Sequence, residues 1–68
     1  MNNQIAKDAT KVLGGAMKMN DPKFTQEIVE SITTRFGHGK ANAIVLAAIE
    51  WGQGNEESAM EIIDYRIK

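Results

Sequence analysis

The sequence predicts a single all-α domain, residues 1–68, built as a compact bundle of four short helices with a central apolar third helix. Three observations lead to this fold class. Apolar residues recur at helical spacing in three segments, turn-forming residues separate the segments, and the stretch from Ala43 to Ile49 is apolar on every side. The expected helices span residues 3–19, 22–36, 40–51 and 55–67.

The first expected helix carries an apolar stripe with steps of four and three residues, which Leu13 and Met17 widen. The stripe, expected to face the core, consists of Ile5, Ala9, Val12, Ala16 and Met19. Gly14 and Gly15 each cost about 1 kcal/mol relative to alanine within a helix. The helix therefore either ends at Leu13 or continues and uses Gly15 for close contact with another helix. The pattern favours continuation.

Asp21 and Pro22 mark the start of the second helix, because Asp accepts hydrogen bonds from free backbone N–H groups and proline lacks an N–H at the first helical position. Gly37 is expected to end this helix in a left-handed conformation. The residues expected to face inward are Phe24, Ile28, Val29, Ile32 and Phe36.

The third helix follows a predicted turn at residues 37–40 and has no polar side, so we expect the other helices to surround it. A buried strand is the alternative for Ala43–Ile49, but its three alanines and its helical neighbours favour a helix. Asn55 is expected to cap the fourth helix. The inward stripe of that helix is Ala59, Met60, Ile63 and Ile67.

The residue inventory argues against several functions. The chain has no cysteine and a net charge of −1, so we expect a reducing cytoplasmic setting and no global attraction to membranes. Its longest apolar run has seven residues, against about 20 for a membrane span. The one imidazole, His38, lies in a glycine turn, and the serines are Ser31 and Ser58. We therefore expect no catalytic group, no metal site and no cofactor.

The segment Gly37–Lys40 places glycines and a lysine before a helix, which are elements of an anion-binding site. It lacks the spacing, the hydroxyl residue and the preceding strand of a phosphate-binding loop. Anion binding by His38, Gly39 and Lys40 is therefore a remote alternative to a simple connecting turn.

A row of lysines on the first helix offers another function. Lys7, Lys11 and Lys18, with Lys23 nearby, could contact the phosphate groups of a nucleic acid. A helix-turn-helix reader would need polar side chains on its recognition helix, and the third helix has none over residues 43–49. The alternative function is thus a nucleic-acid-associated regulator that contacts phosphates through these lysines, while a solvated helix face explains the same pattern.

Apolar side chains in excess on the fourth helix favour protein binding. Ile62 and Tyr65 lie off its inward stripe, and with Trp51 they suggest an association surface. The competing interpretation is that Trp51 and Tyr65 pack across the thin core of the chain itself. The leading hypothesis is a small non-enzymatic regulatory or adaptor protein, of the inhibitor or accessory type, that binds another protein and also self-associates as a homo-oligomer.

The stretch from Phe36 to Ile63 resembles the ubiquitin-associated class of small helical domains. These domains have a glycine-containing loop, a helix ending in Ala-Leu, and a Gly-Asn or Gly-Asp turn followed by regularly spaced apolar residues. The matching residues here are Phe36-Gly37, Ala48-Ile49, Gly54-Asn55, Ala59 and Ile63. The spacing from loop to helix is longer and the family's Met-Gly-Phe loop is absent. The resemblance therefore implies similar helix packing and does not carry ubiquitin binding over.

Overall fold

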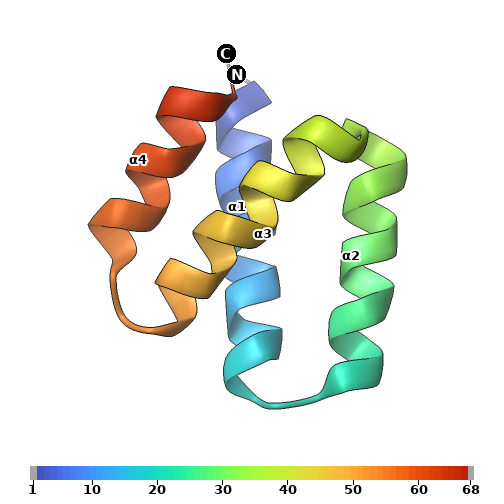
Figure 1. Ribbon diagram of the computed structural model, residues 1–68. Helices are drawn as coiled ribbons and strands as arrows, with labels where there is room; N and C mark the ends of the chain where they lie inside the picture. The colour runs from blue at the N-terminus through green and yellow to red at the C-terminus, as the bar shows by residue number, and fades with distance from the viewer. Residues whose placement is uncertain (1, 68) are drawn as a thin grey trace.

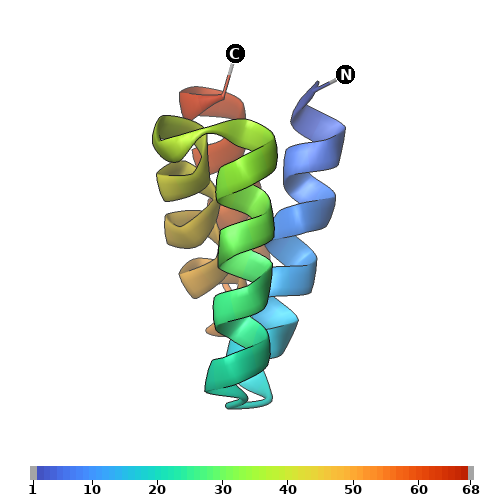
Figure 2. The same ribbon diagram turned by 90° about the vertical axis from the view of Figure 1, so that its right-hand side faces the viewer.

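A computed structural model describes residues 2–67, and within that range it contains helices and no strand. The helices are α1 (Asn2–Lys18), α2 (Pro22–Phe36), α3 (His38–Gly52) and α4 (Glu56–Arg66). α3 crosses in front of α1, with α4 on one side and α2 on the other (Figure 1). From the side, α1 and α2 run next to each other in opposite directions (Figure 2). The predicted all-α bundle is confirmed.

The helix boundaries agree with the predicted ones to within two residues. α1 continues through both of its glycines, as the apolar pattern favoured. The predicted turn at residues 37–40 is wrong in its length, because Gly37 alone, with φ +86°, separates α2 from α3. His38, Gly39 and Lys40 therefore belong to the first turn of α3. Glycine tolerates this positive φ, so one residue suffices to reverse the chain direction.

Two helix starts that look alike in sequence are capped differently. The Asp21 carboxylate accepts a hydrogen bond from the Phe24 N–H at 3.1 Å, which confirms the predicted cap of α2. Asn55 occupies the position before α4, but its side chain makes no capping bond there. Its amide Nδ2 instead donates to Glu50 Oε1 at 3.4 Å. Asn55 is therefore the N-cap residue of α4, as predicted, but its side chain does not bond to the helix N–H groups.

This difference predicts unequal effects of two similar substitutions. Asp21→Ala is expected to lower the free energy of unfolding by about 1 kcal/mol, because it leaves a helix N–H without its partner. Asn55→Ala is expected to cost less, because no capping bond is lost. Urea unfolding followed by circular dichroism measures both variants. Equal losses would show that the two positions cap their helices alike.

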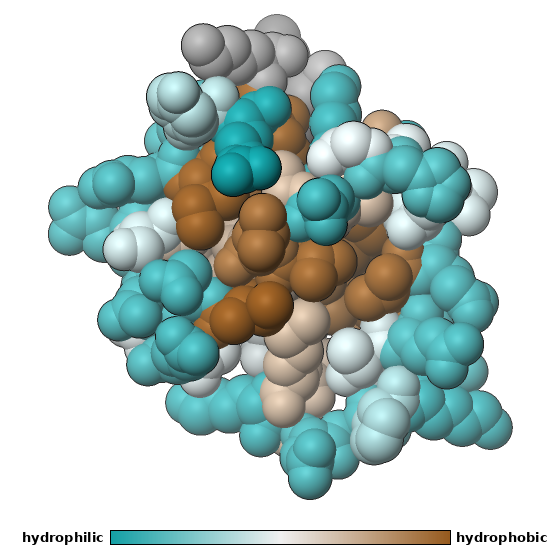
Figure 3. Space-filling model, in the orientation of Figure 1, coloured by the Kyte–Doolittle hydropathy of each residue, from teal (hydrophilic) through white to brown (hydrophobic). Residues whose placement is uncertain are grey.

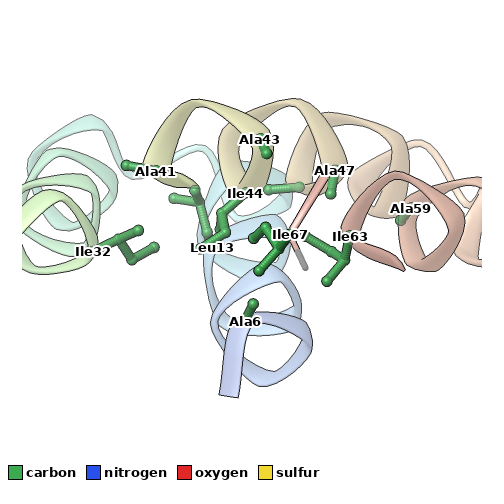
Figure 4. Packing of buried hydrophobic residues seen from close by; sticks show 11 residues of the cluster. Ala6, Leu13, Ile32, Ala41, Ala43, Ile44, Ala47, Ala59, Ile63 and Ile67 are labelled. Atoms are coloured by element: carbon green, nitrogen blue, oxygen red, sulfur yellow. The ribbon is translucent and has the colours of Figure 1, made fainter. Parts of the chain in front are cut away.

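The core lies where α3 meets α1 and α4 (Figure 4). Its largest fully buried apolar side chains come from α1, α3, α4 and the residue that follows α4: Leu13, Ile44, Ile63 and Ile67. Thr10 is also fully buried, and its hydroxyl donates to the Ala6 carbonyl at 2.8 Å, so the hydroxyl is satisfied within its own helix. α2 contributes one fully packed residue, Ile32. α2 is therefore the helix with the smallest share in the core.

The close crossing of α1 and α3 depends on Gly14. A Cβ atom at this position would lie 2.5 Å from Trp51 Cδ1 and 3.1 Å from the Ala48 carbonyl oxygen. A Cβ atom on Gly15 would meet no atom within 4 Å. The helix contact predicted for Gly15 therefore belongs to Gly14. Gly14 and Gly15 are consecutive residues, so they point in directions about 100° apart around the helix axis. Only Gly14 points toward the crossing.

The apolar stripe predicted for α1 faces the core only in part. Ala16 is buried, but Ile5, Val12 and Met19 are exposed. The core instead receives Ala6, Thr10 and Leu13, from the neighbouring side of the helix. Alanine and threonine are small enough to fit where neighbouring helices pack closely, and the threonine hydroxyl costs little because it is bonded within the helix. On α2, Phe24 is likewise exposed, whereas the inward stripe predicted for α4 is buried or half-buried.

Candidate functional site

One side of α3 is apolar and open to solvent. Leu46 is 38% exposed, Ile49 is 42% exposed, and Val45 is half-buried beside them. Steps of three and four residues place all three on one side of the helix. We call Val45, Leu46 and Ile49 the α3 surface. In Figure 3, apolar side chains gather across the middle of the face where α3 crosses the molecule in Figure 1.

The α3 surface corrects the prediction that α3 is surrounded on every side. α3 packs against α1, α2 and α4, which bury residues such as Ala41, Ile44 and Ala48. Three neighbours cover only part of the circumference of a helix, so its remaining side stays open. The all-α bundle is still the predicted one, and α3 contacts each of the other helices, as α1 also does.

Ile62 and Tyr65 lie at the edge of the α3 surface. Tyr65 is 79% exposed, and Ile62 is half-buried against the core. Both residues line an open concavity together with Glu50 of α3. Glu50 follows Leu46 by one helical turn, so this concavity adjoins the α3 surface. The structure therefore brings these two predicted binding residues next to an exposed apolar area.

Trp51 lies elsewhere. Its side chain packs against Gly14 at the crossing of α1 and α3, and the Lys11 ammonium lies 5.6 Å from the centre of its ring. This is a cation–π arrangement. Trp51 is half-buried, and its position is separate from that of Ile62 and Tyr65. Its contact with Gly14 agrees with the interpretation that Trp51 packs across the core of the chain.

The predicted lysine row is partly engaged within the molecule. Lys7 Nζ forms an ion pair with Asp64 Oδ1 at 3.0 Å, and Lys11 lies over the Trp51 ring. Lys18 and Lys23 are exposed. Because α1 and α4 are neighbours, Asp64 of α4 neutralises the charge of Lys7 within the same molecule. Phosphate binding by these four lysines stays a prediction.

The predicted anion-binding residues are exposed at the start of α3. His38 and Gly39 line a concavity with Val29 and Thr33 of α2, and Lys40 contributes to a different one. Among residues 2–67, no group of three or more His, Cys, Asp or Glu side chains could hold a metal ion. In the same range, no helix has both the length and the apolar character needed to cross a membrane.

Sequence reasoning missed a second apolar surface, which lies between α1 and α2. We call it the α1–α2 groove, and its lining consists of Ile5, Asp8, Ala9, Val12, Ile28, Ser31, Ile32, Arg35 and Phe36. The signal was present in the first helix, because Ile5 and Val12 belong to its predicted stripe. The spacing predicts that this stripe faces the core, but hydrophobic spacing does not tell which neighbour, if any, covers a stripe.

No protein-family model, no curated protein and no solved structure matches this chain. The resemblance of residues 36–63 to ubiquitin-associated domains thus has no support from a family match. The functional proposals that follow rest on the surfaces of the molecule.

Proposed function

We propose that this chain is a small, non-enzymatic regulatory or adaptor protein that acts by binding other proteins, including a second copy of itself, in the cytoplasm. The observation that carries this proposal is the α3 surface. It combines exposed aliphatic side chains with the adjoining Ile62 and Tyr65. Exposed apolar side chains gathered on one side of a small protein and bordered by polar residues are typical of a protein-binding site.

The charges beside the α3 surface favour one class of partner. Glu50 and Glu61 line the concavity that holds Tyr65, and Arg66 is the basic residue there. The acidic excess on this border would attract a partner whose apolar contact residues have basic neighbours. Charges at the rim act mainly on the rate of association, while the aliphatic side chains provide most of the affinity.

The placement of the polar side chains supports a binding role rather than catalysis. Ser58 of α4 lines the concavity that holds Tyr65, Ser31 lines the α1–α2 groove, and His38 of α3 lines a concavity with residues of α2. Nucleophilic catalysis needs a hydroxyl and a base within hydrogen-bond distance of each other. These three side chains lie on different surfaces.

The experiment compares three forms of the chain as bait in an extract of cells that make it. The double variant Leu46→Asp/Ile49→Asp places charges on the α3 surface, whereas Val12→Asp makes the same kind of change in the α1–α2 groove. We expect the unchanged chain and Val12→Asp to retain the same protein and the double variant to lose it. With that protein purified, calorimetry should show binding at least about 100-fold weaker for the double variant.

Circular dichroism of the three forms verifies that each is folded before binding is compared. An unchanged chain that retains no protein would contradict the proposed function. A double variant that binds the purified protein as tightly as the unchanged chain would contradict the assignment to the α3 surface.

A further inference from the structure

The α1–α2 groove carries the residue spacing of a helical bundle on both of its sides. On α1, the lining residues Ile5, Ala9 and Val12 follow steps of four and three, and the exposed Met19 lies at the same spacing beyond the buried Ala16. On α2, the residues at the same spacing are Phe24, Ile28, Ser31 and Arg35. Alternating steps of three and four are those of helices that pack along their length at a small crossing angle.

The groove is uncovered along this spacing. Val12, at its middle, is 55% exposed, and Ile5 and Phe24 are also exposed. α3 crosses α1 on the opposite side (Figures 1 and 2). Two antiparallel helices with one apolar side open are half of a four-helix bundle. A second hairpin with the same spacing would complete it, and this chain itself contains such a hairpin.

The charges in the groove are complementary to those of a second copy. Asp8 of α1 and Arg35 of α2 both line it, and Arg35 lies at the end where Ile5 is close to Phe36. If two grooves face each other across a two-fold axis parallel to the helices, α1 of one copy lies opposite α2 of the other at the same level. Each Asp8 then meets Arg35 of the second copy, which gives two equivalent pairs.

A two-fold axis perpendicular to the helices gives no such pairing. It would place α1 against α1 and α2 against α2 in opposite directions. Arg35 would then lie near Phe24 and Lys23, at the far end of α2 of the second copy. The charge pattern therefore selects the parallel axis.

We propose that the α1–α2 groove is the interface of a two-fold homodimer, in which the two hairpins form a four-helix bundle and Asp8 of each copy faces Arg35 of the other. This inference rests on the proposed self-association and names its surface and its symmetry. It leaves both α3 surfaces of the dimer free for other proteins.

The dimer should be weak enough to dissociate on dilution. α1 has 17 residues and so spans about 25 Å. A face of that length and two helices wide is smaller than the roughly 800 Å² per partner of a standard interface.

Light scattering over a concentration series should show the mass of the unchanged chain rising from monomer to dimer. Val12→Asp should remain a monomer at concentrations where the control Ile49→Asp still forms dimers.

These variants separate the inference from the proposed function. A dimer that persists in Val12→Asp and is lost in Ile49→Asp would show self-association through the α3 surface and would overturn the inference alone. A chain that stays monomeric throughout would overturn both the inference and the proposed self-association, while partner binding at the α3 surface is decided by its own experiment.

Charge reversal tests the symmetry without touching the core. Asp8→Arg and Arg35→Asp should each weaken the homodimer, by about tenfold, because each replaces two opposite-charge contacts by two like-charge contacts. An equimolar mixture of the two variants should restore association, since both contacts in the mixed dimer again pair opposite charges. A mixture that associates no better than the separate variants would overturn the proposed arrangement.

Discussion

Replacement of Ile44 by alanine is expected to lower the free energy of unfolding by about 3 kcal/mol. Ile44 is fully buried at the centre of the core, between α3 and the helices packed against it. The substitution removes buried methyl and methylene groups and leaves a cavity that the rigid neighbours fill only in part. For a chain of 68 residues the total stability is about 3–10 kcal/mol, so this single change removes a large part of it.

The matched control is Ile49→Ala, which is the same substitution on the same helix. Ile49 is partly exposed on the α3 surface, so its loss should cost less than about 1 kcal/mol. Urea unfolding monitored by circular dichroism and by Trp51 fluorescence measures both variants. Should Ile44→Ala be unfolded without urea, Ile44→Val, with an expected cost of about 1 kcal/mol, provides the comparison. Equal costs at the two positions would contradict the assignment of core and surface on α3.

Alanine at Gly14 and alanine at Gly15 are expected to shift the stability in opposite directions. Gly14→Ala should lower the free energy of unfolding by about 1–2 kcal/mol, because the new Cβ would overlap Trp51 and press on the Ala48 carbonyl. The overlap itself is expected to cost about 2–3 kcal/mol, and the gain of about 1 kcal/mol in helix propensity offsets part of this cost. Gly15→Ala meets no neighbouring atom, so it should raise the stability by about 0.5–1 kcal/mol.

Thermal and urea unfolding of these two variants, with Trp51 fluorescence as a probe of the crossing, provides the measurement. We expect the fluorescence of the folded state to change in Gly14→Ala and to stay the same in Gly15→Ala. Stabilisation by both substitutions would show that α1 and α3 do not approach each other at Gly14 as closely as described.

The exposed apolar surfaces could be predicted from the sequence only in part. The helical period places Ile62 and Tyr65 off the inward stripe of the last helix, and of these two Tyr65 is exposed whereas Ile62 is half-buried against the core. Leu46 and Ile49 were missed because they lie in a run that is apolar throughout. Such a run indicates burial on average, and it does not tell which side the other helices leave uncovered.

The α1–α2 groove escaped prediction for a related reason. Its α1 residues form the most regular apolar stripe of that helix, and regular stripes usually face a core. Here the core is on the neighbouring side of α1, which carries Ala6, Thr10 and Leu13. Hydrophobicity alone ranks Ile5 and Val12 above Ala6 and Thr10, whereas close packing against the neighbouring helices favours the smaller side chains.

The sequence by itself determined the helices found within residues 2–67, their ends to within two residues, and the apolar character of α3, which contacts the other three helices as α1 also does. These features depend on interactions between residues within about one helical turn, such as the Asp21 cap, and on the apolar character of a whole segment. Only the tertiary structure decided which side of α1 is buried, which of the two adjacent glycines lies at the crossing, and which apolar residues remain exposed. Those outcomes depend on how closely neighbouring helices can approach, and that distance is set by the shapes of side chains far apart in the chain.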